Sequence, residues 1–599
     1  MIPMPAPSLE LGLIGNAATA ALLNALGDVT WMCLPRFDGD PVFCRLLEPQ
    51  SGPDSGLWSI RCDGLARTRQ SYRGHTAILE TIQEDDQGNR LKITDFLPRF
   101  PDRGRMFRGR TLVRIVEPLA GTPRITVRLC PRHGYGAHAA RVMRGSNHLR
   151  YDLDQQALRL TTSAPVEFVL NETPFLLDRP HAFLLGPDEP LSDGPHVIAA
   201  AFLERTEAYW LDWVRALSIP PDYQEVVIRA AITLKLCEYE ETGAIVAALT
   251  TSIPEYADTQ RNWDYRFCWL RDSFFTVKAL NSLGVTKTME DYLAYVLNLA
   301  TGTPDGYMQP LFGLGHERVL DEETCPALLG YDGNGPVRCG NAAYAQVQND
   351  GYGSVILAVS QCFFDQRLPR LGGVELFERL EVLGRQAVAR WNTPDAGLWE
   401  FRTRESVHTH SVLMCWGACD RLARIAAHLG LPQRAAAWGS HADAMRQAIE
   451  SQGWNDTVGA YVSAFGGADL DASLLLMPEV GYCTGENPRY QATVAACEAQ
   501  LRQGHHLFRY RAPDDFGTPE TAFTACTFWL IDALVRLGRH DEAREIFAAV
   551  LEQRTALGLL SEDVHVASRT LWGNFPQTYS MVGLINAAIK LSRKWEDVV

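Results

Sequence analysis

The sequence predicts an α+β multidomain protein: an N-terminal antiparallel β-sandwich over residues 1–217, followed by an (α/α)6 barrel over residues 218–599. Three observations lead to this prediction. The chain has 599 residues, which is long for a single domain. Short runs rich in valine, isoleucine, leucine, threonine and tyrosine occupy its first third. Long segments of helical periodicity occupy the rest.

Seven short runs in the first third are expected to be strands of the sandwich. Turn residues, such as the Asp-Gln-Gly-Asn at 86–89, separate several of them, as in antiparallel sheets. The expected strands are 76–83, 90–97, 111–117, 124–129, 149–153, 157–162 and 196–202. Acidic and aromatic residues over 203–217 then predict a helix that links the two domains.

The rest of the chain contains twelve segments with apolar helical periodicity. They start near Gln224, Ser273, Thr288, Tyr344, Gly373, His408, Pro432, Asp471, Tyr490, Pro519, His540 and Pro576. Twelve helices in series predict six hairpins closed into a ring. A solenoid of helix pairs is the alternative, but no repeated sequence period supports it.

The links between these helices alternate in length. Links from an even to an odd helix are mostly short, whereas most links from an odd to an even helix are long. The long links are 243–272, 301–343, 392–407, 502–518 and 556–575. In an up-and-down ring these links all lie at one end, where long loops on a rigid scaffold form sites. Residues far apart in the sequence can therefore converge there.

Composition narrows the classes of function. A net charge of −15 disfavours nucleic acid and anionic membranes as partners, and leaves a neutral ligand such as a sugar open. We expect no signal peptide, and no uninterrupted apolar run reaches about 18 residues. The 14 cysteines are scattered without metal-ligand spacing, which is typical of buried thiols in a reducing compartment. We expect a cytoplasmic protein without metal or cofactor, and leave a homo-oligomer open.

The first motif with chemical potential spans residues 262–272 and combines four aromatic with four charged side chains. Trp263 and Trp269 can stack on the apolar faces of sugar rings. Arg271 and Asp272 offer fixed donors and acceptors for hydroxyls. The alternative is that Asp272 caps the following helix and the aromatics belong to the core.

Two further motifs each carry a carboxylate. Glu400 follows Trp399 in an apolar setting, which would raise its pKa and suit a general acid. Glu562 is flanked by polar residues, so it is expected to stay ionised and to activate a water. Either could instead be an exposed surface acid. Two carboxylates on opposite sides of a glycosidic bond are the minimum for its hydrolysis, and inversion requires a separation of about 6.5–9.5 Å.

Weaker signals come from two other loops. Gln348 and Asp350 precede an apolar helix and could bind hydroxyls, although helix capping is the commoner role. Arg509 and Arg511 would bring cations to the same rim, or form a surface ion-pair cluster.

As a set, these residues resemble glycoside hydrolase family 15, which includes glucoamylases, glucodextranases and bacterial trehalases. The similarity covers nearly the whole chain. The N-terminal segments at 13–16 and 31–38 resemble the trehalase-like N-terminal domain, and the segments at 262–272, 340–343, 348–350, 397–400, 561–562 and 573–577 resemble barrel motifs.

The resemblance implies that Glu400 is the acid, that Glu562 is the base, and that Arg271 and Asp272 hold the terminal glucose, with Arg509 or Arg511 nearby. Fungal glucoamylases carry an acidic residue after the acid, whereas Phe401 stands here, so long starch chains are disfavoured. We expect inverting, exo-acting hydrolysis of an α-glucoside, with α,α-trehalose as first choice. Maltose or isomalto-oligosaccharides, a disaccharide phosphorylase and a non-catalytic sugar-binding protein are the alternatives.

A dead-end pocket is also expected, because release of glucose from a chain end needs one. Tyr307, Phe312 and Tyr331 in the long link at 301–343 are expected to wall one side. The segment of Arg36, Phe37 and Asp38 is expected to close another.

Overall fold

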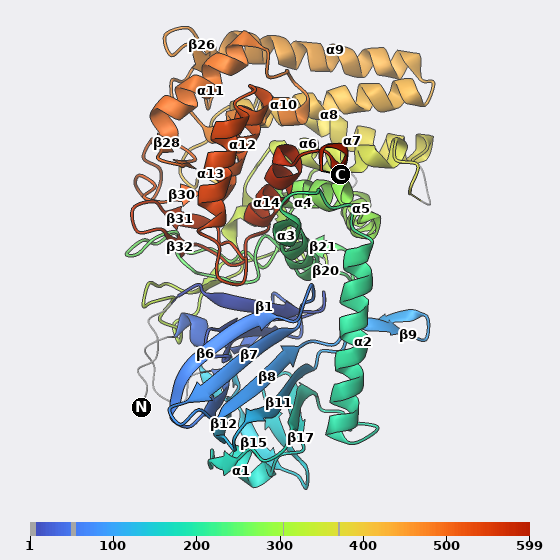
Figure 1. Ribbon diagram of the computed structural model, residues 1–599. Coiled ribbons are helices and arrows are strands. Elements are labelled where there is room, and N and C mark those ends of the chain that lie inside the picture. Colours follow the sequence, from blue (N-terminus) through green and yellow to red (C-terminus); the bar gives the residue numbers. More distant parts are fainter. Residues whose placement is uncertain (1–7, 49–55, 304, 369–371, 599) are drawn as a thin grey trace.

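A computed structural model describes residues 8–48, 56–303, 305–368 and 372–598 of the chain. Its β-rich part and its helical part are stacked, and the long helix α2 (Pro195–Arg215) runs beside the strands toward the helices (Figure 1). Within the described ranges, no helix is both long and apolar enough to cross a membrane.

The β-rich part is a two-layer antiparallel sandwich, as predicted. One sheet has the order β1-β2-β3-β5-β12-β18, with β4 beside β3, and the other has the order β15-β16-β17-β19-β11-β8-β7-β6. The first sheet contains β1 (Leu11–Gly15), β2 (Ala20–Asn24), β3 (Val29–Leu34), β4 (Asp40–Phe43), β5 (Leu57–Cys62), β12 (Arg124–Cys130) and β18 (Phe175–Leu176). The second contains β6 (Leu65–Tyr72), β7 (Leu79–Asp85), β8 (Arg90–Phe96), β11 (Leu112–Ala120), β15 (Arg141–Arg144), β16 (His148–Asp152), β17 (Ala157–Thr162) and β19 (His181–Pro187). Side chains such as Ile60 and Val127 from the first sheet and Leu91 from the second share one core.

The strand predicted at 196–202 is wrong, because these residues form the start of α2. Pro195 occupies the first helical turn, and three consecutive alanines follow at 199–201, both of which favour a helix. Ala199, Thr206 and Trp210 are buried at helical spacing. Ala199 packs with Phe96 and Leu184 on the outer face of the second sheet.

The helical part contains all twelve predicted segments, arranged as two concentric rings. The inner ring consists of α4 (Leu270–Ser282), α6 (Asp350–Ser360), α8 (Thr409–His428), the short helices η5 (Ala472–Leu476) and α10 (Met477–Val480), α12 (Thr524–Arg536) and α14 (Thr578–Leu591). Each member contacts the next, and α14 contacts α4, so the ring closes. The outer ring consists of α3 (Gln224–Leu236), α5 (Thr286–Thr301), α7 (Val374–Arg390), α9 (Pro432–Ala448), α11 (Pro488–Leu501) and α13 (His540–Leu551). This arrangement is the (α/α)6 barrel that the sequence predicts.

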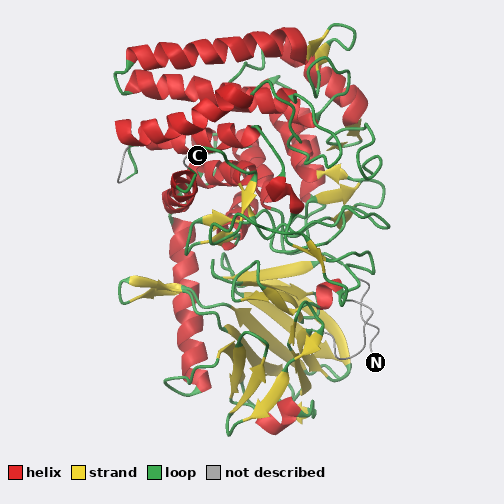
Figure 2. Ribbon diagram, turned by 180° about the vertical axis from the view of Figure 1, so that it is seen from behind, coloured by secondary structure: helices red, strands yellow, loops and turns green. Residues whose placement is uncertain are grey.

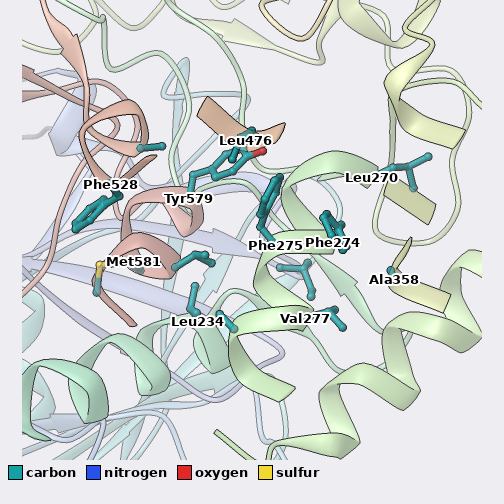
Figure 3. Close-up of a cluster of buried hydrophobic side chains, with 14 of the residues drawn as sticks. Leu234, Leu270, Phe274, Phe275, Val277, Ala358, Leu476, Phe528, Tyr579 and Met581 are labelled. Atoms are coloured by element: carbon teal, nitrogen blue, oxygen red, sulfur yellow. The ribbon is translucent and has the colours of Figure 1, made fainter. Parts of the chain in front are cut away.

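Burial separates the two rings. Every residue of α6 is buried, whereas α7 buries a single stripe that includes Phe377, Leu380 and Leu383. Figure 3 shows part of the barrel core. In it, Phe275 lies between its α4 neighbour Phe274 and Tyr579, which belongs to α14. Because Tyr579 also lines the main pocket described below, the core extends to the floor of that pocket.

Part of the loop-bearing end of the barrel meets the sandwich. Loops and short strands run along the right of the helices in Figure 2, and the lower ones lie next to the β-rich part. The indole Nε1 of Trp31 donates to Leu249 O at 2.8 Å, and Arg266 Nη1 donates to Gly39 O at 2.8 Å. Arg266 is fully buried and is paired with Asp264 at 2.7 Å. The sandwich therefore holds the link between α3 and α4 in place.

Candidate active site

The main pocket opens at the N-terminal ends of the inner helices. Its volume is about 880 Å³ with the mouth included, within the usual range for small-molecule sites. The lining residues come from four of the long links and from residues near the starts of α6, α12 and α14: Ala247, Glu255, Arg261, Trp263, Tyr265, Trp269, Arg271, Asp272, Asn341, Ala343, Gln346, Leu398, Trp399, Glu400, Phe401, Arg402, Arg509, Tyr510, Asp514, Asp515, Phe516, Phe523, Trp529, Gln577 and Tyr579. Helix N-termini leave backbone N–H groups without intrahelical partners, so this end of the barrel suits a polar ligand.

Two neighbouring aromatic side chains connect the two candidate carboxylates. Trp269 Nε1 donates to Glu400 Oε1 at 2.6 Å, and the Tyr265 hydroxyl donates to Glu562 Oε1 at 2.7 Å. The rings of Tyr265 and Trp269 lie edge to face, with centroids 5.3 Å apart. The link between α3 and α4 thus fixes both carboxylates, although these are 162 positions apart in the sequence.

Glu400 sits in a backbone conformation that side chains rarely adopt, with φ of +62°. The turn that imposes it is held by Asp395, whose Oδ2 accepts from Asn349 N and Ser411 Oγ, each at 2.7 Å. Such strain persists only where the surroundings fix it, and it occurs often at functional sites. The turn leaves the Glu400 side chain 22% exposed at the pocket.

Glu562 lies just before strand β31 (Asp563–His565) and is almost fully buried, at 1% exposure. It is not among the described residues that line the pocket, and it contacts the pocket through Tyr265. Asn574 N donates to Glu562 Oε2 at 3.3 Å. A Cβ at Gly573 would lie 2.6 Å from the Glu562 Cβ, and Gly573 has φ of +75°, so glycine is required there.

The surroundings of Glu562 in the fold oppose its ionisation, contrary to the expectation from its polar neighbours in the sequence. Burial raises the pKa of Glu562 well above its usual value, and the charges of Asp563 and Glu255 raise it further, against the opposing hydrogen bond from Tyr265. Burial also raises the pKa of Asp272 to about 7, against the opposing charge of Arg271. Environment in the fold, rather than neighbours in the sequence, sets the ionisation of these groups.

Arg271 is the central cation of the inner end of the pocket. Its Nη1 donates to Gln348 Oε1 and to Asp350 Oδ2, both at 3.0 Å, and its Nη2 lies 3.4 Å from Glu400 Oε1. Gln348 and Asp350 were predicted to bind hydroxyls, but they are outside the described pocket lining. Their hydrogen bonds instead orient the Arg271 guanidinium. Asp350 Oδ1 is buried without a partner within the described part of the chain.

Six of the residues predicted to bind substrate line the pocket: Trp263, Trp269, Trp399, Arg271, Asp272 and Arg509. Arg511 does not: it is exposed, its guanidinium lies over the Phe508 ring at 3.6 Å, and its Nη2 donates to Gln503 Oε1. Arg509 Nη2 donates to Glu255 Oε2 at 2.5 Å.

The predicted pocket walls are partly wrong. Tyr307, Phe312 and Tyr331 are not among the described lining residues, and the link at 301–343 contributes Asn341 and Ala343 instead. Arg36, Phe37 and Asp38 are likewise absent from the described lining. Arg36 Nη1 donates to Glu317 Oε1 at 3.0 Å, so this segment supports that link from outside.

Several lining residues were not selected from the sequence. Two of the long links contain Glu255, Arg261, Asp514 and Asp515. Their position in these links is the sequence feature that could have identified them. Arg261 binds Asp514 with two hydrogen bonds of 2.6 and 2.7 Å. Within the described residues, no group of three or more histidine, cysteine or acidic side chains could hold a metal ion.

The fold, the pocket and its paired carboxylates are those of a glycoside hydrolase. The family profile "Glycosyl hydrolases family 15" matches residues 221–589, and the chain belongs to this family. A second profile, "Trehalase-like, N-terminal", matches residues 4–174.

Named relatives and one solved structure resemble the chain over nearly its whole length. A trehalase of Thermoplasma volcanium is 30% identical over 97% of this chain and 93% of its own. A trehalase of Mycolicibacterium smegmatis is 30% identical over 99% of this chain and 92% of its own. The crystal structure of a bacterial glucoamylase complexed with acarbose superposes with a TM-score of 0.70 at 12% identity, covering 98% of this chain and 94% of that one, and so shares the fold.

Proposed function

We propose that this enzyme hydrolyses α,α-trehalose with inversion, using Glu400 as general acid and Glu562 as general base. The observation that carries the proposal is the pair of carboxylates fixed by Trp269 and Tyr265 at one pocket. Relatives named trehalase, similar over both the sandwich and the barrel, support the choice of substrate.

In the proposed reaction the terminal glucose enters the inner end of the pocket, where Arg271 and Asp272 hold its hydroxyls. Glu400, facing the pocket, protonates the glycosidic oxygen as the bond to the anomeric carbon breaks. Ionised Glu562 takes a proton from a water on the opposite face, and that water attacks the anomeric carbon. Positive charge develops on the sugar ring in the transition state. Negative charge on Glu562, and on Glu400 as it gives up its proton, stabilises it.

A substrate panel tests the proposal. Wild-type enzyme is incubated in phosphate-free buffer with trehalose, maltose, isomaltose, kojibiose and soluble starch, and released glucose is measured. The highest kcat/KM is expected with trehalose. Highest activity on maltose or isomaltose would favour the glucoamylase-type alternative, which the fold shared with a bacterial glucoamylase supports. Release of glucose only when phosphate is added would favour a phosphorylase. No release of glucose with or without phosphate would favour a non-catalytic binding protein.

Replacing Arg271 by Lys is expected to raise KM and lower kcat together, so that kcat/KM falls about 10²-fold. Lysine keeps the charge but loses the planar fork that contacts Gln348, Asp350 and Glu400 at once. Steady-state kinetics with trehalose measure the effect, and thermal unfolding controls for folding. If kcat and KM both stay near the wild-type values, Arg271 has only a structural role.

The pH dependence of kcat/KM follows from the raised pKa of Glu562. A general base must be ionised, so activity is expected to fall as the pH drops through the pKa of Glu562. Because this pKa is raised, the fall is expected at a higher pH than an ordinary glutamate would give. Asp563→Asn removes a neighbouring carboxyl group whose charge raises the pKa of Glu562, and keeps an acceptor for Thr521 Oγ1, which donates to Asp563 Oδ1 at 3.0 Å. The acid limb is therefore expected to move to lower pH. An unchanged limb would mean that another group controls it.

The proposal extends to the domain boundary and the location of the protein. We place the boundary between residues 217 and 218, because α2 packs along the sandwich before the barrel begins. A cytoplasmic location is supported by the cysteines, since most of the fourteen are buried.

A further inference from the structure

The solvent-facing end of the pocket is built differently from its buried inner end. Trp263, Arg402, Asp515 and Phe516 line it, and each comes from one of three links that are far apart in the sequence. Arg271 is buried at the inner end, whereas the Arg402 side chain keeps 30% of its surface exposed. Arg402 therefore lies between the pocket and solvent.

Contacts from three other links fix Arg402 in this place. Its Nη1 and Nη2 donate to the two carboxylate oxygens of Glu322 at 3.2 and 2.8 Å. Its guanidinium carbon lies 4.4 Å from the centre of the Trp263 ring. Its backbone N–H donates to Asp515 Oδ2 at 2.6 Å. A paired ion contact and a ring contact together hold a planar guanidinium in one orientation.

The partners of Arg402 are themselves held. Arg338 Nη1 donates to Glu322 Oε1 at 2.9 Å, and Ala342 N donates to Glu322 Oε2 at 3.3 Å. Burial opposes ionisation of Glu322, but the hydrogen bonds and charge of Arg402 lower its pKa below the usual value, so Glu322 stays charged. Trp263 lies edge to face with Phe516, with centroids 5.2 Å apart. Moving Arg402 would therefore disturb several contacts at once.

We infer that Arg402, clamped between Glu322 and Trp263, forms the outer wall of the subsite for the leaving sugar and limits substrates to disaccharides. This inference rests on the proposed function, which places the bond to be cleaved beside Glu400. The leaving glucose then lies between Glu400 and Arg402. A third sugar attached to it would have to extend toward solvent, through the space that the guanidinium occupies.

The test compares trehalose with a trisaccharide in which the leaving glucose of trehalose carries one further α-1,4-linked glucose. Cleavage of the trehalose bond in this trisaccharide yields glucose and maltose, so maltose reports the reaction that needs space beyond the leaving sugar. The ratio of kcat/KM for the trisaccharide to that for trehalose is measured in wild type, Arg402→Ala and Glu322→Gln. Arg404→Ala is the matched control, because Arg404 lies in the same link but contacts Phe401 and Pro513 O instead.

The ratio is expected to rise at least about tenfold in Arg402→Ala and by less in Glu322→Gln, and to stay unchanged in Arg404→Ala. An unchanged ratio in Arg402→Ala would overturn the inference even if activity on trehalose falls, since Arg402 would then only bind the leaving sugar. An equal rise in Arg404→Ala would also overturn it. If Arg402→Ala does not fold, Glu322→Gln decides.

The experiment distinguishes a wrong choice of substrate from a wrong role for Arg402. If wild type releases no glucose from trehalose but cleaves maltose, the same ratio is measured with maltotriose and maltose. A rise in Arg402→Ala then supports the wall although the proposed substrate is wrong, and no rise overturns both.

Discussion

Replacing Glu562 by Gln is expected to lower kcat for trehalose at least about 10³-fold while KM stays close to the wild-type value. The amide cannot take a proton from water, but its oxygen can still accept the hydrogen bond that Tyr265 donates at 2.7 Å. The interaction that is lost acts mainly in the transition state, so substrate binding is preserved. Initial rates over a range of trehalose concentrations measure both constants.

Glu552→Gln is a suitable control for this variant. Glu552 lies at the end of α13, with a side chain 68% exposed, and its only ion pair among the described residues is a 3.6 Å contact with Arg569. The control is expected to behave as wild type. Near-normal turnover of Glu562→Gln would remove Glu562 from the role of base.

Replacing Glu400 by Gln is expected to reduce hydrolysis of trehalose by about 10³-fold, but to reduce hydrolysis of α-glucosyl fluoride far less. A sugar leaving group needs a proton from Glu400, whereas fluoride departs with much less help. Trp269 Nε1, which donates to Glu400 Oε1 at 2.6 Å, can still donate to the amide oxygen, so the site keeps its shape. Rates on the two substrates give the comparison.

Glu562→Gln is the matched comparison for Glu400→Gln, because the base is needed whatever the leaving group. Its rates on trehalose and on α-glucosyl fluoride should both fall strongly. If Glu400→Gln instead loses both substrates equally, Glu400 does not act by protonating the leaving group.

Helical periodicity predicted almost all helices of the barrel. The starts of two helices show where periodicity fails. The helix predicted from Tyr344 begins at Asp350, because residues 342–345 form a separate 3-10 turn. The helix predicted from Pro519 begins at Thr524, after the short strand β30 (Ala522–Phe523). Both shifts occur in long links, where contacts between links rather than local propensity decide the backbone.

Strands β1 to β5 were not predicted because they lack the alternation of a half-buried strand. All residues of β1 and β3 are buried. Leu11 and Leu13 belong to the core shared with the barrel, whereas Ile14 belongs to the core between the two sheets. A strand covered on both faces appears as a continuous apolar run, which periodicity alone cannot assign.

Most of the candidate site could be predicted because its residues cluster in the long links and the helix starts beside them. What could not be predicted is which charges pair across links. Arg509 meets Glu255, and Arg402 meets Glu322, at separations of 254 and 80 residues. The burial of Glu562 is likewise set by the fold, since its sequence neighbours Ser561 and Asp563 are polar.

The anomeric form of the first product tests the central claim most directly, because it depends on the roles of both carboxylates. Proton NMR is recorded during the first minutes of trehalose hydrolysis by wild-type enzyme, before mutarotation mixes the anomers. If water activated by Glu562 attacks the face opposite the leaving group, one glucose is released as the β-anomer and the other departs as the α-anomer, in equal amounts. If Glu562 attacked the sugar and formed a covalent intermediate, both glucose molecules would appear as the α-anomer. Equal initial signals are the predicted result, and α-glucose alone would contradict the mechanism.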